Sequence, residues 1–265
     1  MRSRTRDRYI LLLDDNADIV EHYKHEIEKV RRFHVTTAFE GRRAQVLAQA
    51  RLFDTVVIDA KLDFKGLEFG GLRLADELRP RYGSSSLVVV SRYITSELMD
   101  LHGADYEFIE KHDGRAGRSF GAELRETIDR LCRDQYAFVA MPFEEKYNAL
   151  YRIAIKPAVT DAGLRCIRID EVPHNRRIHD VIYDGVHKSK LVIFVADGAN
   201  PNAYYEAGFA DAMRKEVVIV AEHLEVLRFD VQTRHTITYG HDEAKLRALL
   251  TKRIRDIRRY SPPGL

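Results

Sequence analysis

The sequence has no tryptophan, only two cysteines, and no apolar run long enough to form a membrane span. Cys132 and Cys166 are too few for a disulfide framework or a four-cysteine zinc cluster. A helix that crosses a bilayer needs roughly 20 consecutive apolar residues, whereas the apolar stretch near the N-terminus covers only residues 9–13 and ends at two aspartates. It is therefore not a signal peptide either. We expect a cytoplasmic protein without a membrane partner.

An excess of one charge is also absent. The 43 Lys and Arg residues nearly balance the 41 Asp and Glu residues, which gives a net charge of +2. A chain with so small a net charge shows no general preference for binding nucleic acid. The basic segment 252–260 alternates with apolar positions, as the solvated face of a helix does, and it could also serve dimer contacts. The sequence contains neither a G-x-G-x-x-G fingerprint nor a Walker loop.

What the chain does have is a regular alternation of strand and helix signals, which runs twice along its 265 residues. The first series predicts strands at 10–13, 34–38, 55–58, 87–90 and 106–109, with helices at about 17–30, 42–50, 71–78 and 120–133. The second predicts strands at 137–140, 165–169, 191–195 and 217–221, with helices at about 144–161, 178–188, 203–214 and 242–260. Such alternation is typical of parallel sheets covered by helices on both faces. We predict an α/β protein of two doubly wound domains, 1–133 and 134–265, joined with little or no linker.

In the first half, charged side chains follow the predicted strands. Asp14 and Asp15 end the first strand, Asp59 ends the third, and Lys111 follows the fifth. Function in an open α/β sheet is located at the carboxyl ends of its strands. Three carboxylates at one edge repel one another unless a cation lies among them, and oxygen ligands of this kind suit Mg²⁺. We therefore expect a magnesium site here, with Lys111 placed to neutralise a phosphoryl group.

Four motifs of this half, LLLDDN, VVIDAKL, VVVSRYI and FIEKH, resemble those of the response-regulator receiver domain over about residues 8–133. The resemblance implies a flavodoxin-like fold, a histidine kinase as partner and phosphorylation of Asp59. It further implies Mg²⁺ binding by Asp14, Asp15, Asp59 and the backbone carbonyl of Lys61, with Lys111 as phosphate partner, Ser91 as switch hydroxyl and Phe108 as rotating aromatic. The loop after Asp59 is longer than usual, and His112 stands where proline is common.

The second half carries the motifs FVAMPF, RIDEV, VIFVAD and NPNAYYEAGFADAM, each at or just beyond a predicted strand end. Asn200-Pro201 predicts a capped helix start, which places Glu206 early in the helix and in the crevice at the strand ends. Met141-Pro142-Phe143 forms a strand-to-helix turn, where backbone N–H groups favour an anion. Tyr204 and Tyr205 offer rings that could stack on a flat base.

These motifs resemble the TIR-like superfamily that includes nucleoside 2-deoxyribosyltransferases, over about residues 136–240. The resemblance implies that Glu206 is the catalytic carboxylate at C1′ of a ribose and that Asp197 and Asp170 orient the sugar or base. Nucleotide contacts are then expected from Met141, Pro142, Phe143, Asp170, Asn202 and Tyr205. Here Tyr205 matches the motif's tyrosine, and the segment DGANPN is shorter than the usual D-L-T-G-x-N-P-N.

Together the two halves predict a response regulator whose phosphorylation controls cleavage of the N-glycosidic bond of a nucleotide, with NAD⁺ as the substrate and a dimer or larger assembly as the active form. Such an enzyme would suit a conditional toxic effector, for example in defence, and the effector half would need no cofactor. Two alternatives remain open. The second half could bind a nucleotide as a sensor or interaction module without cleaving it, or it could transfer deoxyribose between bases.

Overall fold

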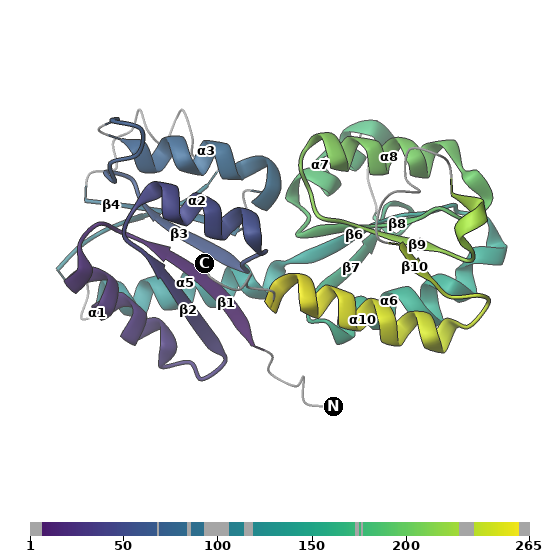
Figure 1. The fold of residues 1–265 in the computed structure, drawn as a ribbon, viewed down its shortest axis with the longest axis horizontal. Coiled ribbons are helices and arrows are strands. Elements are labelled where there is room, and N and C mark those ends of the chain that lie inside the picture. The colour runs from purple at the N-terminus through teal and green to yellow at the C-terminus, as the bar shows by residue number, and fades with distance from the viewer. Residues whose placement is uncertain are drawn as a thin grey trace. The chain divides into compact units, whose positions relative to one another are not determined.

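The computed structural model describes residues 7–67, 69–83, 86–92, 106–113, 119–172, 175, 177–227 and 236–259. Contacts divide the chain into two units, which are described separately: unit 1 comprises residues 1–134 and 257–265, and unit 2 comprises residues 135–256. Each unit has a five-stranded parallel sheet flanked by helices (Figure 1). This confirms the predicted α/β class with two doubly wound sheets.

The sheet of unit 1 has the strand order β2-β1-β3-β4-β5, which is the flavodoxin-like order. Its strands are β1 (Arg8–Leu13), β2 (Phe33–Ala38), β3 (Thr55–Asp59), β4 (Leu87–Ser91) and β5 (Glu107–Glu110). Every residue of β3 and β4 is buried, because helices cover both faces of the sheet. Full burial of one such Val, Leu or Ile side chain stabilises the fold by roughly 1.5–3 kcal/mol.

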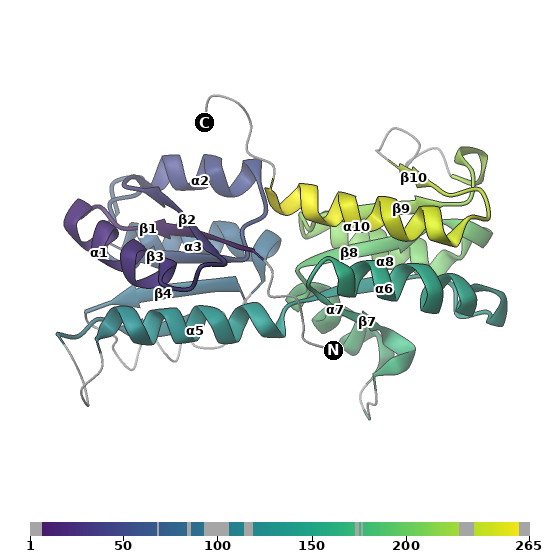
Figure 2. The ribbon, with the colours of Figure 1, turned by 90° about the horizontal axis from the view of Figure 1, so that it is seen from below.

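Among the described residues, the helices that cover this sheet are α1 (Ala17–Glu28), α2 (Gly41–Ala50), α3 (Gly70–Tyr82) and α5 (Phe120–Asp134). α1 packs with α5 on one face, and α2 packs with α3 on the other (Figures 1 and 2). The Asn16 side chain caps α1 by accepting hydrogen bonds from the backbone N–H groups of Asp18 and Ile19, as asparagine commonly does at a helix start.

The sheet of unit 2 has the strand order β10-β9-β8-β6-β7. Its strands are β6 (Tyr136–Ala140), β7 (Arg165–Arg168), β8 (Leu191–Val195), β9 (Val217–Ala221) and β10 (Thr236–Thr238). Helices α7 (Ile178–Lys188) and α8 (Pro201–Ala212) share one face, and α6 (Lys156–Asp161) and α10 (Glu243–Arg259) share the other (Figures 1 and 2). The sequence patterns did not predict β10.

The helix predicted over 144–161 is divided. A 3₁₀ turn (Glu145–Tyr147) precedes a π-helical segment (Leu150–Ile155), and α6 follows. Pro157 lies in the first turn of α6. A proline ring clashes with the carbonyl four residues earlier in a regular α-helix, and the wider π turn before it relieves this conflict.

Both connections to unit 2 are short. Gln135 alone separates α5 from β6. At the other end, residues from Ile257 onward group with unit 1. There Arg258 Nη2 donates to Asp54 Oδ1 at 2.6 Å, and the fully buried Asp54 also accepts from the backbone N–H of Tyr9. Within the described part of the chain, no helix is long and apolar enough to cross a bilayer.

Candidate functional site

In unit 1, the carboxyl ends of β1 and β3 bring three carboxylates together. Asp14 and Asp15 follow β1, Asp59 ends β3, and the carboxylate oxygens of the three lie within 4.8 Å of one another. The ammonium of Lys111, just after β5, donates to Asp14 Oδ2 at 2.7 Å and to Asp59 Oδ1 at 2.9 Å. The strand order produces this meeting, because β1, β3, β4 and β5 are parallel neighbours.

Burial governs the electrostatics of this cluster. Burial raises the pKa of the Asp59 carboxyl, and the positive charge of Lys111 opposes that rise. Burial also acts against a charged Lys111, but Asp59 and Asp14 outweigh it and raise the pKa of the lysine. Lys111 is therefore held as a cation between two carboxylates, while Asp15 stays exposed at the surface.

The other residues expected at this site lie on β4, on β5 and in the turn after β3. Ser91 ends β4 and is buried, and its carbonyl accepts from the backbone N–H of Lys111 at 2.7 Å. Phe108 is half-buried on β5, with its ring edge-on to that of Tyr106. Lys61 lies in the turn after β3, and its ammonium is 5.9 Å from the centre of the Phe69 ring.

Helix α3 lies directly against the end of β3. A Cβ atom added to Gly71 would lie only 1.8 Å from the carbonyl oxygen of Asp59. Real Cβ atoms do not approach backbone this closely, so only glycine lets the helix pack here. Gly71 thus fixes the backbone of the residue that stands at the centre of the cluster.

The donor set of unit 1 fits a hard divalent cation. Three carboxylates supply oxygen ligands, which Mg²⁺ prefers, and Mg²⁺ commonly keeps several waters as well. The exposure of Asp15 leaves one side of the cluster open to solvent. Lys111 balances part of the negative charge through its contacts with Asp14 and Asp59. These contacts hold the carboxylates together without a bound ion.

In unit 2, the carboxyl end of β8 leads to Asp197, which is buried and fully hydrogen-bonded. Its Oδ1 accepts from the backbone N–H of Glu222 at 2.7 Å, and its Oδ2 accepts from the Tyr239 hydroxyl at 2.7 Å. Burial raises the pKa of Asp197, and these two hydrogen bonds limit the rise. Asp197 therefore joins the ends of β8, β9 and β10.

Glu206 differs from Asp197 in having no hydrogen-bond or ion-pair partner among the residues that the structure describes. It lies on the buried face of α8, which also carries Ala203, Ala207 and Ala210, and only 3% of its surface is exposed. Burial raises the pKa of Glu206 to about 7. A carboxyl group with this pKa can take up or lose a proton near neutral pH, which is a property of many catalytic carboxylates.

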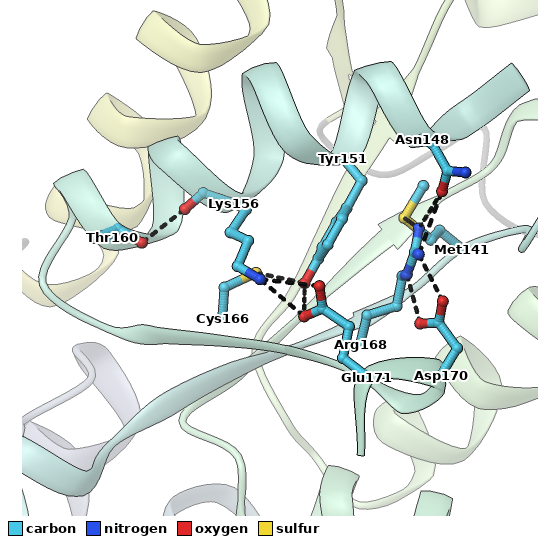
Figure 3. Close-up of polar contacts among 9 residues, drawn as sticks. All are labelled: Met141, Asn148, Tyr151, Lys156, Thr160, Cys166, Arg168, Asp170 and Glu171. Atoms are coloured by element: carbon cyan, nitrogen blue, oxygen red, sulfur yellow. Dashed lines mark hydrogen bonds and ion pairs between the residues drawn. The ribbon is translucent and has the colours of Figure 1, made fainter. Parts of the chain in front are cut away.

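Asp170 is held by the arginine of its own RIDEV motif. Arg168, the last residue of β7, donates from Nε and Nη2 to the two oxygens of Asp170, each at 2.6 Å. Arg168 also donates to the Asn148 side chain, and its guanidinium lies 4.3 Å from the centre of the Tyr151 ring (Figure 3). Arg168 thus fixes the orientation of the Asp170 carboxylate, whose side chain remains 37% exposed.

A second part of this network surrounds the Tyr151 hydroxyl, which donates to Glu171 at 2.7 Å (Figure 3). Lys156 Nζ also donates to Glu171. Burial raises the pKa of the neighbouring Cys166 thiol to about 11. The thiol is therefore protonated at neutral pH and is not an activated nucleophile.

The remaining residues expected to contact a nucleotide differ in their exposure to solvent. Met141 is buried and Phe143 is exposed, with Pro142 buried between them. Asn202 is exposed in the first turn of α8. Tyr205 is 53% exposed, and its hydroxyl lies 2.5 Å from that of Tyr183.

One ring and two buried residues behave differently from their sequence signals. Tyr204, considered for base stacking, packs edge-on against Phe194 in the core. The sequence patterns predict no role for Tyr239 or Lys215. Burial lowers the pKa of Lys215 to about 7, yet its ammonium donates to the carbonyls of His187 and Ser189. Cations are favoured at a helix C-terminus, so Lys215 has a structural role at the end of α7.

No family model matches this sequence, and no curated protein matches it either. Solved structures with similarity include the receiver domain of the Francisella response regulator 1452, which is 22% identical, with 47% of this chain and 96% of that one covered and a TM-score of 0.39. The response regulator TrrA of Thermotoga maritima in complex with Mg²⁺-BeF is 23% identical, with 47% and 98% covered and a TM-score of 0.37. The receiver domain of the histidine kinase PA1611 of Pseudomonas aeruginosa, with magnesium in its active-site cleft, is 17% identical, with 47% and 97% covered and a TM-score of 0.35. At these identities and TM-scores the likenesses assign no function.

Proposed function

We propose that unit 1 is a receiver that accepts a phosphoryl group on Asp59 from a histidine kinase. One observation carries the proposal: the Lys111 ammonium bridges Asp14 and Asp59, and the Asp15 carboxylate lies within 4.8 Å of theirs. A nucleophilic carboxylate, two further carboxylates for a cation and a fixed positive charge are the groups that phosphoryl transfer requires.

In the proposed reaction, a carboxylate oxygen of Asp59 forms a bond to phosphorus while the phosphorus–nitrogen bond of a phosphohistidine breaks. The electron pair of that bond leaves with the imidazole. Mg²⁺ held by Asp14, Asp15, Asp59 and the carbonyl of Lys61 would neutralise charge on the phosphoryl oxygens. Lys111 would pair with one of those oxygens, and the Ser91 hydroxyl would hydrogen-bond another. Phe108 would then change its rotamer.

Phosphorylation with a small-molecule phosphodonor tests this assignment. Incubation of the full chain with acetyl phosphate and Mg²⁺ should give an acid-stable, base-labile acyl phosphate, detectable by its shift in a phosphate-affinity gel. Asp59→Asn should abolish the shift, because an amide is not a nucleophile. Asp63→Asn is the matched control, since Asp63 is exposed four residues away. Equal labelling of the wild type and Asp59→Asn would refute the proposal.

For unit 2 we propose cleavage of the N-glycosidic bond of a nucleotide, with NAD⁺ as the substrate and Glu206 as the catalytic carboxylate. The supporting observation is the burial of Glu206 without a described partner, together with its pKa of about 7. An unpaired buried carboxylate is costly for the fold, so a positively charged ligand or transition state would gain strongly from its presence. The nicotinamide ribosyl group of NAD⁺ provides such a charge.

The bond between C1′ and the nicotinamide nitrogen would break with its electron pair passing to the cationic ring, which leaves as neutral nicotinamide. The Glu206 carboxylate would stabilise or trap the positive charge that develops on the ribose. Water would then add its hydroxyl to C1′ and release a proton. Asp170, oriented by Arg168, and Asp197 would orient the ribose or the base.

Nicotinamide release from NAD⁺ tests the second assignment. We expect the wild type to release nicotinamide above pH 7, where Glu206 is ionised, and Glu206→Gln to lower the rate by at least about 1,000-fold, which corresponds to loss of roughly 4 kcal/mol of transition-state stabilisation. The matched control is Glu145→Gln, at an exposed glutamate of the same unit. Release at the same rate by Glu206→Gln would contradict the role of Glu206.

The same preparation separates the alternatives. A deoxyribosyltransferase would form product from a deoxynucleoside only when an acceptor base is added. A sensor would show a rise in thermal stability with a nucleotide but no product. Addition of beryllofluoride and Mg²⁺ tests whether phosphorylation of unit 1 controls unit 2 through a dimer or larger assembly, since Asp59→Asn should then lose any response.

A further inference from the structure

Three side chains that neither proposed site uses come together at the ends of β9 and β10. Glu222 and His223 directly follow β9, and His241 lies three residues beyond β10. The carboxylate oxygen and the two imidazole nitrogens all lie within 4.8 Å of one another. We propose that Glu222, His223 and His241 form a binding site for Zn²⁺.

The backbone holds these residues in position. The ladder between β9 and β10 continues past the strands, with the N–H of Tyr239 bonded to the Ala221 carbonyl and the N–H of Gly240 bonded to the Glu222 carbonyl at 3.0 Å. The N–H of Glu222 is bonded to Asp197. Both the N–H and the carbonyl of Glu222 are therefore held by hydrogen bonds without a bound ion.

The turn after β10 directs His241 back toward Glu222. Gly240 and His241 both have left-handed backbone conformations, with φ of +57° and +62°. Such a φ is uncommon for a residue with a side chain, although histidine tolerates it better than most. In this arrangement Nε2 of His241 pairs with Oε1 of Glu222, and Nε2 of His223 lies 3.8 Å from the same oxygen.

The ligand types select the metal. Two imidazole nitrogens and one carboxylate oxygen form a set used by zinc sites that keep a fourth position open. Mg²⁺ and Ca²⁺ prefer oxygen ligands alone, as in the Asp14, Asp15 and Asp59 cluster. Ligand atoms around tetrahedral zinc lie roughly 3–3.5 Å apart, given bonds of about 2 Å. The histidine side chains are 55% and 79% exposed, so they can rotate by the small amount needed and an ion can reach them from solvent.

A bound ion would act on the neighbouring Asp197. Both segments that supply the ligands also supply the hydrogen bonds of Asp197, from the Glu222 N–H and from the Tyr239 hydroxyl. Zinc would therefore join the two segments and restrict their movement around this carboxylate. The proposal is independent of whether unit 2 cleaves a nucleotide, because it rests on the ligands alone.

Zinc titration of the full chain tests the proposal. Metal-free protein in excess Mg²⁺, which occupies the carboxylate cluster of unit 1, is titrated with ZnCl₂ in competition with a chromophoric chelator. We expect one zinc per chain, and at least about a tenfold loss of affinity in each of Glu222→Gln, His223→Ala and His241→Ala. His34→Ala is the matched control, because His34 is an exposed histidine paired with Asp7 at 3.1 Å but belongs to no such group of three among the described residues. It should bind zinc as the wild type does.

Absence of zinc binding by the wild type, or equal zinc affinity in the wild type and all three variants, would overturn the proposal. Far-UV circular dichroism identifies any variant that misfolds. Co²⁺ provides a second readout on the wild type alone. Visible ligand-field bands that disappear when zinc is added support a site with nitrogen ligands, whereas a spectrum no different from that of aqueous Co²⁺ contradicts it.

Discussion

Unit 1 and unit 2 both bury carboxylates beside a five-stranded parallel sheet, but they differ in whether the buried carboxylate has a cationic partner. In unit 1, Lys111 lies between Asp14 and Asp59 and donates to both. In unit 2, Glu206 is equally buried and has no described partner, and its pKa is about 7. The comparison shows that one architecture can hold either an anionic cluster paired with a lysine or a single buried carboxylate without a described partner.

The largest effect is expected from removing the cation of unit 1. Lys111→Met leaves the buried carboxylates of Asp14 and Asp59 without their counter-ion and should lower the free energy of unfolding of unit 1 by about 3 kcal/mol in the presence of a chelator. Millimolar Mg²⁺ should restore most of this loss, because it replaces the missing charge. Urea unfolding, monitored by hydrogen exchange in peptides that contain β1 and β3, measures this loss of stability. The control Lys65→Met removes an exposed pair with Glu77 and should change stability by less than about 1 kcal/mol. If Mg²⁺ fails to rescue Lys111→Met, the carboxylates do not form a cation site.

An effect of opposite sign is expected in unit 2. Glu206→Gln removes a buried charge, so at pH 8 the variant should be more stable than the wild type by up to about 3 kcal/mol. Because the folded-state pKa of Glu206, about 7, exceeds its ordinary 4.5, protonation stabilises the wild-type fold at low pH. That stabilisation is complete below pH 4.5 and is lost as the pH rises through 7. The difference between the two proteins should therefore disappear near pH 4.5, which unfolding at several pH values would show. If the difference in stability between the two proteins stayed constant with pH, burial would not raise the pKa of Glu206.

The smallest effect is expected at Asp197, the hydrogen-bonded carboxylate of unit 2. Tyr239→Phe removes the hydroxyl that donates to Asp197 and should destabilise unit 2 by about 1–2 kcal/mol. Loss of this donor should also raise the pKa of Asp197 further above its ordinary value. Thermal unfolding and carboxyl titration by NMR measure the two changes. Tyr183→Phe, which alters an exposed hydroxyl pair, should change neither, and a Tyr239→Phe variant that behaved like it would show that Asp197 does not depend on this bond.

The sequence was most informative where long buried strands end in charged residues. The runs before Asp14 and Asp59 are continuous and apolar, so their ends are readily located, and the chain alternation implies which ends meet. In this way Lys111 could be assigned to the same end of the sheet as Asp14, from which it is 97 positions away in the sequence. The same reasoning located Glu206 after the Asn-Pro signal of α8.

Features that depend on side-chain pairing or on short elements were not visible. β10 has only three residues and two of them are threonine, so it has no apolar run, and Tyr239 was missed with it. The bidentate pair of Arg168 and Asp170 depends on how the chain bends after β7, which sequence spacing does not reveal. Tyr204 was considered for stacking, but its place on the core-facing side of α8 packs it against Phe194.

The contact between Arg258 and Asp54 bears on how the two units can be exchanged in evolution. A module attached at one end can be exchanged by a single recombination event at that junction. Unit 2 occupies residues 135–256, and the chain before and after it belongs to unit 1. Exchange of unit 2 alone would need two breakpoints, one near Gln135 and one near Asp256, or else Asp54 would lose the guanidinium of Arg258. The pairing of Asp54 with Arg258 therefore favours inheritance of the two units together.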